Sequence, residues 1–229
     1  MNELPKIFCA IDTSDLDQAK ELIKKTTSAG CGIKLGLEFF NSLGPQGVKN
    51  VMEACNDPSI FLDLKYYDIP NTVAGAVRSA SKLGISYLNV HASGGLDMMK
   101  AAKDACDPKT KLLAVTILTS FDNHSLQEAG YQKTMTDCVR QLAQLSQKAS
   151  LDGVVCSAHE IEVLRQECDD DFVLMVPGIR PKESDQNDQK RIMDPKEALD
   201  KGATHLVIGR PITKAHDPVS AARNIIGSL

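Results

Sequence analysis

One short segment, DLKYYD at residues 63–68, gathers side chains suited to acid–base chemistry. Asp63 and Lys65 stand two residues apart, so in a strand they lie on the same face. Nearby carboxylates favour the charged form of a lysine, which predicts a proton donor at Lys65 rather than a Schiff-base nucleophile. For an isolated segment of this kind, a structural network of salt bridges at the rim is an open alternative to catalysis.

A second chemical signal lies near the end of the sequence, in HLVIGRPIT at residues 205–213. A predicted strand there runs into Gly209 and Arg210 at the start of a helix. Free backbone amides and a small residue let a phosphate approach closely, and an arginine adds a charge-assisted contact. The alternative is that Gly209 only permits tight packing.

The polar loop at residues 179–191 supports the prediction of a phosphate site. It has no apolar period, and a loop of this length is either disordered or a lid. It begins within the segment PGIRP at residues 177–181 and contains Gln189. Together with Arg210, the loop predicts a phosphorylated small substrate that is covered on binding.

The elements that must position these residues alternate between short apolar runs and longer stretches of helical period. Strands are predicted at residues 7–12, 32–37, 60–65, 87–92, 112–118, 153–157, 172–178 and 205–209. Continuous apolar runs such as LLAVTIL are expected where helices cover both faces of a parallel sheet. The pattern predicts an α/β fold, a (β/α)8 TIM barrel forming a single domain over residues 1–229. An open doubly wound sheet is the second choice, because no GxGxxG motif follows the first strand.

In such a barrel, chemistry sits at the carboxyl ends of the strands, which strengthens the catalytic interpretation of residues 63–68. Polar side chains collect at the predicted strand ends: Asp12, Lys34, Asp63, Lys65, Asn89, His91, Thr119, Ser120 and Arg210. Helix starts are predicted from candidate capping residues: Thr13, Ser14 or Asp15 for the first helix, Asn71 or Thr72 for the third, Ser93 for the fourth and Asp194 for the seventh.

The composition of the chain argues against several classes of partner. The chain has 229 residues with 26 basic and 30 acidic side chains, so no basic surplus favours nucleic acid or an anionic membrane as a partner. Seven cysteines without a CxxC pair are typical of reduced thiols in a cytoplasmic protein. No run approaches the length of a membrane span. Without a dinucleotide fingerprint or metal-ligand spacing, we expect no cofactor and no metal.

Several ordered motifs resemble orotidine 5'-monophosphate decarboxylase of the bacterial, single-domain kind. The most specific are DLKYYDIPNT at 63–72, AVTILTS at 114–120, MVPGIRP at 175–181 and VIGRPIT at 207–213. The shorter segments AID at 10–12 and IKLGLEFF at 33–40 stand in the expected order. One departure is Tyr67, where many relatives have histidine; this places a local hydrogen bond in doubt, not the activity.

The resemblance implies decarboxylation of orotidine 5'-monophosphate to uridine 5'-monophosphate in pyrimidine biosynthesis, without a cofactor. It assigns the proton donor to Lys65 and the carboxylate beside the departing group to Asp63, with Lys34 and Asp68 completing the charged array. Asp68 and Thr72 would reach into the neighbouring subunit's site, which implies a homodimer with shared active sites. Substrate contacts are implied for Asp12, Lys34, Asp63, Ile69, Thr72, Thr119, Ser120, Pro177, Arg180, Gln189, Gly209 and Arg210.

Two rival functions follow from the same residues. The magnesium-dependent 3-keto-L-gulonate 6-phosphate decarboxylase and hexulose phosphate synthase group shares DxKxxD, but the DIPNT continuation and the PGIRP segment argue against it. A catalytically inactive barrel that only binds or scaffolds is the other, and the intact Asp63, Lys65 and Asp68 argue against that.

Overall fold

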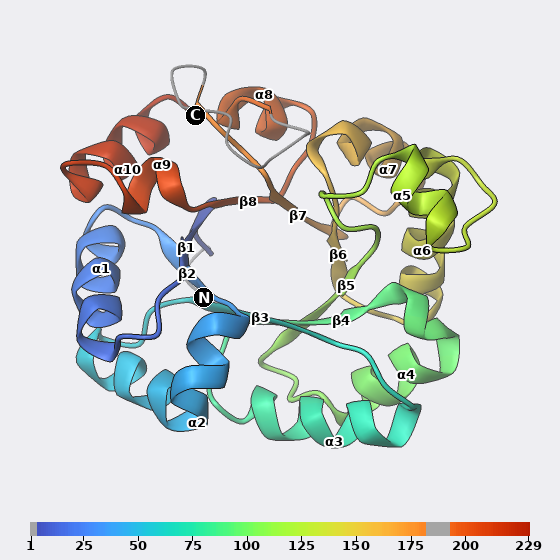
Figure 1. Cartoon of the computed structure of the whole chain (residues 1–229), viewed down its shortest axis with the longest axis horizontal. Helices are drawn as coiled ribbons and strands as arrows, with labels where there is room; N and C mark the ends of the chain where they lie inside the picture. Colours follow the sequence, from blue (N-terminus) through green and yellow to red (C-terminus); the bar gives the residue numbers. More distant parts are fainter. Residues whose placement is uncertain (1–3, 182–192) are drawn as a thin grey trace.

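The computed structural model describes residues 4–181 and 193–229, and its strands close into a parallel barrel in sequence order, ringed by helices (Figure 1). The strands are β1 (Ile7–Ile11), β2 (Gly32–Leu35), β3 (Ile60–Tyr66), β4 (Tyr87–His91), β5 (Lys111–Val115), β6 (Gly153–Val155), β7 (Val173–Pro177) and β8 (His205–Ile208). Each predicted strand is confirmed, and the (β/α)8 barrel with it. The largest boundary error is at β5, predicted to reach Leu118, because the apolar Ile117 and Leu118 line a cavity instead of continuing the strand.

Helices follow the strands around the outside of the barrel. They are α1 (Leu16–Ser28), α2 (Leu37–Ala54), α3 (Pro70–Ser81), α4 (Gly95–Ala105), α5 (Asn123–Glu128), α6 (Met135–Lys148), α7 (Ile161–Glu167), α8 (Pro195–Asp200), α9 (Arg210–Thr213) and α10 (Pro218–Gly227), with short 3₁₀ turns η1 (Ala92–Gly94) and η2 (Ala158–Glu160). Within the described residues, no helix is both long enough and apolar enough to cross a bilayer.

Helix starts test the capping predictions. Asp15 caps α1 by accepting from two backbone amides, and Asp194 caps α8 by accepting from the backbone amide of Lys196, as predicted. Ser93 is a wrong prediction, because it lies inside η1 and α4 begins after Gly94 without a side-chain cap. The prediction of Asn71 or Thr72 for α3 is also wrong: Pro70 occupies the first turn, where its fixed φ suits the helix and its missing N–H costs no hydrogen bond.

Alternate strand residues fill the inside of the barrel, while their neighbours pack outward against the helices. The inward cluster is largely apolar and consists of Phe8, Ala10, Phe61, Tyr87, Leu113, Val115, Val155, Val173, Met175 and Val207. The outward residues form the larger core between barrel and helices. Inward positions nearer the carboxyl ends of β2 and β3 carry charge instead, at Lys34, Asp63 and Lys65.

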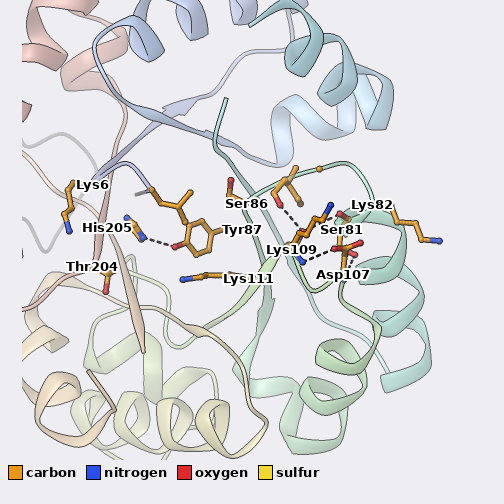
Figure 2. A pocket seen from close by; sticks show the side chains of 14 residues that line it. Lys6, Ser81, Lys82, Ser86, Tyr87, Asp107, Lys109, Lys111, Thr204 and His205 are labelled. Atoms are coloured by element: carbon orange, nitrogen blue, oxygen red, sulfur yellow. Dashed lines mark hydrogen bonds between the residues drawn. The ribbon is translucent and has the colours of Figure 1, made fainter. Parts of the chain in front are cut away.

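Aromatic side chains close the barrel at its amino end. The ring of Phe8 makes edge contacts with Phe61, Tyr87 and His205, at centroid distances of 6.5, 5.6 and 5.4 Å. Gly32 leaves room for this ring, since a Cβ there would lie 2.7 Å from it. Tyr87 Oη and His205 Nε2 are joined by a hydrogen bond of 2.8 Å, drawn as a dashed line in Figure 2. His205 Nδ1 lies 2.8 Å from the carbonyl of Pro5, which only accepts, so Nδ1 donates this hydrogen bond.

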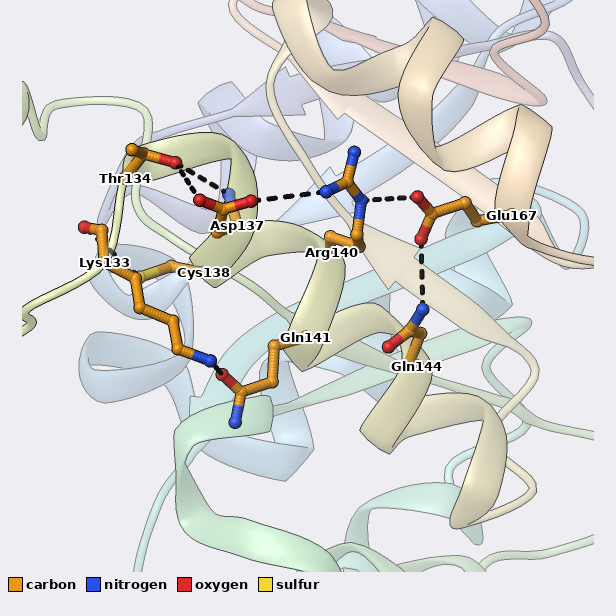
Figure 3. A network of polar contacts seen from close by, with 8 residues as sticks. All are labelled: Lys133, Thr134, Asp137, Cys138, Arg140, Gln141, Gln144 and Glu167. Carbon is orange, nitrogen blue, oxygen red and sulfur yellow. Dashed lines mark hydrogen bonds and ion pairs between the residues drawn. The ribbon is translucent and has the colours of Figure 1, made fainter.

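A polar network ties α6 to α7 on the outside of the barrel (Figure 3). Arg140 contacts Glu167 through Nε and donates to Asp137 Oδ1 at 3.2 Å. Gln144 donates to the other carboxylate oxygen of Glu167 at 3.1 Å. These contacts fix neighbouring helices and lie away from the strand ends, so we assign them a structural role.

Candidate active site

Charged side chains from three adjacent strands meet at the carboxyl end of the barrel. Lys65 Nζ lies 2.6 Å from Asp63 Oδ1, and Lys34 Nζ lies 3.6 Å from Asp63 Oδ2. Lys34 also donates to Asp12 Oδ1 at 3.2 Å. Asp63 therefore stands between two ammonium groups, and the structure brings together Asp12, Lys34, Asp63 and Lys65 as the sequence predicts.

Asp63 is the electrostatic centre of this array. Its side chain is 13% exposed. Burial by itself raises the pKa of Asp63, but the ammonium charges of Lys65 and Lys34 and the hydrogen bonds from Lys65 and Asn89 outweigh it, so the pKa lies below its ordinary value. The carboxylate is thus held ionised between its two lysines.

Lys65 has an unusual backbone conformation. Its φ is +51°, the left-handed region that long side chains adopt at a cost of about 1–3 kcal/mol. The pairing of β3 with β4 shifts register between Leu62 and Tyr66, so Lys65 falls in the irregular stretch. Strain of this kind persists only where surrounding contacts impose it, and it is concentrated at functional sites.

Two cavities meet at the charged array. The larger, of about 630 Å³, is polar and lined by Asp12, Gln18, Glu21, Lys34, Asp63, Arg180, Gly209, Arg210 and Lys214 among others. The smaller, of about 150 Å³, is mostly apolar and lined by Phe61, Val115, Ile117, Leu118, Thr119, Val155, Cys156 and Pro177 together with Lys34, Asp63 and Lys65. Lys34, Asp63, Pro177 and Val207 border both. The arrangement suits a molecule with a flat apolar part and a charged part joined beside the lysines.

Arg180 supplies buried positive charge to the polar cavity. The residue is 7% exposed, and its Nε has no hydrogen-bond partner among the described residues. Burial, and then the charge of Arg210, lower the pKa of the Arg180 guanidinium. Its backbone amide donates to the carbonyl of Met193 at 3.0 Å. Two guanidinium groups on one cavity make a strong site for an anion.

Some predicted site residues lie apart from this array within the chain. Asp68, Ile69 and Thr72 are exposed, and Asp68 Oδ1 accepts from the backbone amide of Ile69 at 2.6 Å. Ser120 is exposed and lines neither cavity, whereas its neighbour Thr119 lines the apolar one. Gln189 and most of the loop predicted at 179–191 lie outside the described residues.

Two residues without a predicted role belong to the site. Asn89 on β4 donates to Asp63 Oδ1 at 2.7 Å and accepts from the Lys65 backbone amide at 2.8 Å. In the sequence, an asparagine within the otherwise largely apolar strand segment YLNV is the feature that indicates a buried polar role for Asn89. Cys156 lines the apolar cavity, and burial keeps its pKa well above the ordinary value, so the thiol is neutral. No spacing rule pointed to Cys156.

His91 is the one histidine singled out at a strand end. Burial, and then the charge of Lys65, lower its pKa, while Asp63 opposes the shift. Its ring lies 5.8 Å from that of Tyr67, with a tilt of 58°. A neutral imidazole therefore borders the array beside the residue that departs from the motif.

Comparisons with known proteins find relatives along nearly the whole chain. The family model described as "Orotidine 5'-phosphate decarboxylase / HUMPS family" matches residues 5–225. The chain is 46% identical to orotidine 5'-phosphate decarboxylase of Idiomarina loihiensis, covering 99% of this chain and 98% of the relative. It is 50% identical to the same enzyme of Rhodospirillum rubrum, covering 97% and 93%.

A solved structure extends the likeness from sequence to fold. The crystal structure of orotidine 5'-phosphate decarboxylase from Lactobacillus acidophilus superposes with a TM-score of 0.86 at 35% identity, covering 98% of each chain. The family match, the full-length relatives and the shared barrel lead to one conclusion. The chain belongs to the orotidine 5'-phosphate decarboxylase / HUMPS family.

Proposed function

We propose that this protein decarboxylates orotidine 5'-monophosphate to uridine 5'-monophosphate, with release of CO2. The observation that carries the proposal is the Lys34–Asp63–Lys65 array at the junction of an apolar and a cationic cavity. Relatives that share about half of its residues over more than nine-tenths of their length carry that enzyme's name. The product, uridine 5'-monophosphate, is a pyrimidine nucleotide, so the reaction belongs to pyrimidine biosynthesis.

The two cavities suggest how the substrate lies. The pyrimidine fits the apolar cavity, beside Thr119 and Pro177, with Ser120 in the adjoining loop. The ribose then falls near Asp12 and Lys34, and the phosphate near the guanidinium groups of Arg180 and Arg210 and the small Gly209. Gln189 is the proposed lid contact to the phosphate.

The chemical step places most demand on Lys65. The bond from C6 to the carboxylate breaks and its electron pair stays on C6 as CO2 leaves. No neighbouring group of the ring accepts that pair, so a preorganised positive charge is the available stabilisation. The Lys65 ammonium donates a proton to C6, and the neutral amine recovers one from water. Asp63 lies beside the departing carboxylate of the substrate. Lys34 pairs with Asp63 Oδ2, the carboxylate oxygen that Lys65 does not contact, and so offsets the negative charge of Asp63.

The substrate phosphate lies far from the bond that breaks, yet its binding energy can contribute to the rate. Contacts made by Arg180 and Arg210 can drive closure of the loop over the substrate, and closure completes the site. Loss of either arginine then affects turnover as well as affinity.

A homodimer would complete each site. The segment after β3 exposes Tyr67 by 63% and Ile69 by 68%, at the same end of the barrel as the array. Exposed apolar side chains of this size are typical of an interface. In the proposed dimer, Asp68, Ile69 and Thr72 reach the partner's site, where Asp68 adds a second carboxylate to the charged array.

Ultraviolet absorbance of orotidine 5'-monophosphate tests the activity. Chelator-treated wild-type protein should consume the substrate without added metal, and a Lys65→Ala variant should not. Failure of the wild type to consume it contradicts the proposal. Turnover of a sugar phosphate only after magnesium is added back would instead assign the chain to the second group that the family description names.

A further inference from the structure

Asn89 occupies an unusual place for an amide side chain. It is fully buried on β4 and faces into the barrel, between the aromatic amino end and the charged carboxyl end. Its carbonyl oxygen accepts from the Lys65 backbone amide at 2.8 Å, and its Nδ2 donates to Asp63 Oδ1 at 2.7 Å. One side chain thus holds both the backbone of the proposed proton donor and the carboxylate that faces it.

The backbone of Lys65 needs such a partner. Four non-glycine residues in the described part of the chain have positive φ, and three of them, Asn56, Asp57 and Ser150, are short polar residues at turns. Lys65 is the fourth and lies within β3, where the register with β4 shifts. A strand amide normally finds its acceptor in the neighbouring strand. Here the Asn89 side chain takes the place of that acceptor.

We propose that Asn89 is a positioning residue, which holds Lys65 in its left-handed backbone conformation and Asp63 against the Lys65 ammonium. The inference rests on the proposed function and adds to it the residue that preorganises its proton donor. A displacement of about 1 Å in such a group lowers turnover by about 10²-fold.

Asn89 acts without touching the substrate. It lines neither of the two cavities, whose walls include Lys65 and Asp63. Its loss should therefore lower kcat by about 10²-fold while KM changes by less than about threefold. This division separates positioning from substrate binding.

The first test compares Asn89→Leu with Tyr87→Phe. Both residues lie on β4, are fully buried and face into the barrel. Asn89→Leu keeps the branching of the side chain but removes its two hydrogen bonds, and Tyr87→Phe keeps the ring but removes the hydrogen bond to His205. Both should lower the melting temperature, but only Asn89→Leu should lower kcat. A kcat for Asn89→Leu within about threefold of the wild type, or an equal loss in Tyr87→Phe, overturns the inference.

The second test uses Asn89→Asp, which conserves the shape of the side chain and keeps the inference testable if Asn89→Leu fails to fold. At neutral pH its carboxylate lacks the proton to donate and repels Asp63. Position 89 contacts Asp63 and Lys65 on β3, and Lys34 on β2 is paired with Asp63. Tyr87 and His91 are the titratable residues two positions away on β4 itself. Two adjacent carboxylates bind a proton at higher pH than one does, and this proton restores a donor between position 89 and Asp63. The ratio of the Asn89→Asp kcat to the wild-type kcat should therefore rise as pH falls. A constant ratio across pH overturns the inference.

A structural measurement separates this inference from the proposed function. Absence of turnover in the wild type would contradict the function alone. Crystal structures of the wild type and of Asn89→Leu would then still show whether Lys65 leaves its positive φ or its ammonium moves from Asp63 by about 1 Å or more. An unchanged Lys65 in the variant overturns the positioning role whatever the reaction is.

Discussion

At the amino end of the barrel, β3 and β4 contribute Phe61 and Tyr87 to an aromatic cluster, whereas at the carboxyl end the same strands contribute Asp63, Lys65 and Asn89 to a charged array. The residues alternate along each strand, so both sets face into the barrel. At the amino end the buried polar groups satisfy one another, as in the hydrogen bond of Tyr87 with His205.

The amino end of the barrel contributes to stability, whereas the carboxyl end carries the charges for the reaction. Closely packed aromatic rings stabilise the barrel and need no other molecule. The carboxyl end instead concentrates two lysines on one carboxylate, which fixes charge in advance of a reaction, and it imposes a strained backbone on Lys65 at a cost in stability. Changes at the two ends should therefore have separable effects on folding and on turnover.

The largest expected effect comes from Lys65→Ala. Loss of both the proton donor and the positive charge should lower kcat/KM by about 10⁴-fold or more. Lys111→Ala is the matched control, because Lys111 lies at the amino end, 6.0 Å from the centre of the Tyr87 ring. Steady-state kinetics on both variants checks the prediction. Comparable losses in the two would mean that the ends are not separable.

Mixed subunits test whether the carboxyl end, unlike the amino end, depends on a partner. Lys65→Ala and Asp68→Ala proteins should each be nearly inactive alone, and mixing should restore activity, since a heterodimer contains one site with both residues intact. Random pairing should restore about one quarter of wild-type activity. Subunit exchange is followed independently with tagged chains. If subunits exchange and no activity returns, the shared site is wrong.

Phe8→Ala disrupts the aromatic cluster at the amino end of the barrel. Phe8 is fully buried among three aromatic rings, so its truncation should lower the free energy of unfolding by about 3–5 kcal/mol. Phe8→Leu keeps more of the contact and should lose less. Urea unfolding measures the stability, and kcat is measured well below the melting temperature. A fall in kcat of the folded variant as large as that of Asn89→Leu would contradict the separation.

The smallest effect is a pH dependence of stability from Asp63. Its pKa in the folded protein lies below the ordinary value of 3.8. A lowered carboxyl pKa contributes stability above the unfolded value, and that contribution is lost as pH falls through the folded value. The difference in unfolding free energy between the wild type and Asp63→Asn should therefore shift against the wild type between pH 6 and about pH 3. A difference independent of pH would contradict the ion-pair assignment.

Local patterns carried most of the fold prediction. The strands, the outer helices and the caps at Asp15 and Asp194 follow from apolar period and capping chemistry, which act over a few residues. The errors arose where local signals compete: Pro70 opens α3 ahead of two good capping residues, and apolar residues after β5 line a cavity.

The sequence by itself determined which residues could do chemistry and that strand ends would carry them, because side-chain alternation and residue type are local properties. Only the tertiary structure decided that Asp63 stands between two ammonium groups from different strands and that Asn89 holds the Lys65 backbone. It also placed Ser120 outside both cavities and brought Arg180 and Arg210 onto one of them. These facts are distances between residues far apart in the chain, set by barrel closure and by a register shift that no local pattern encodes.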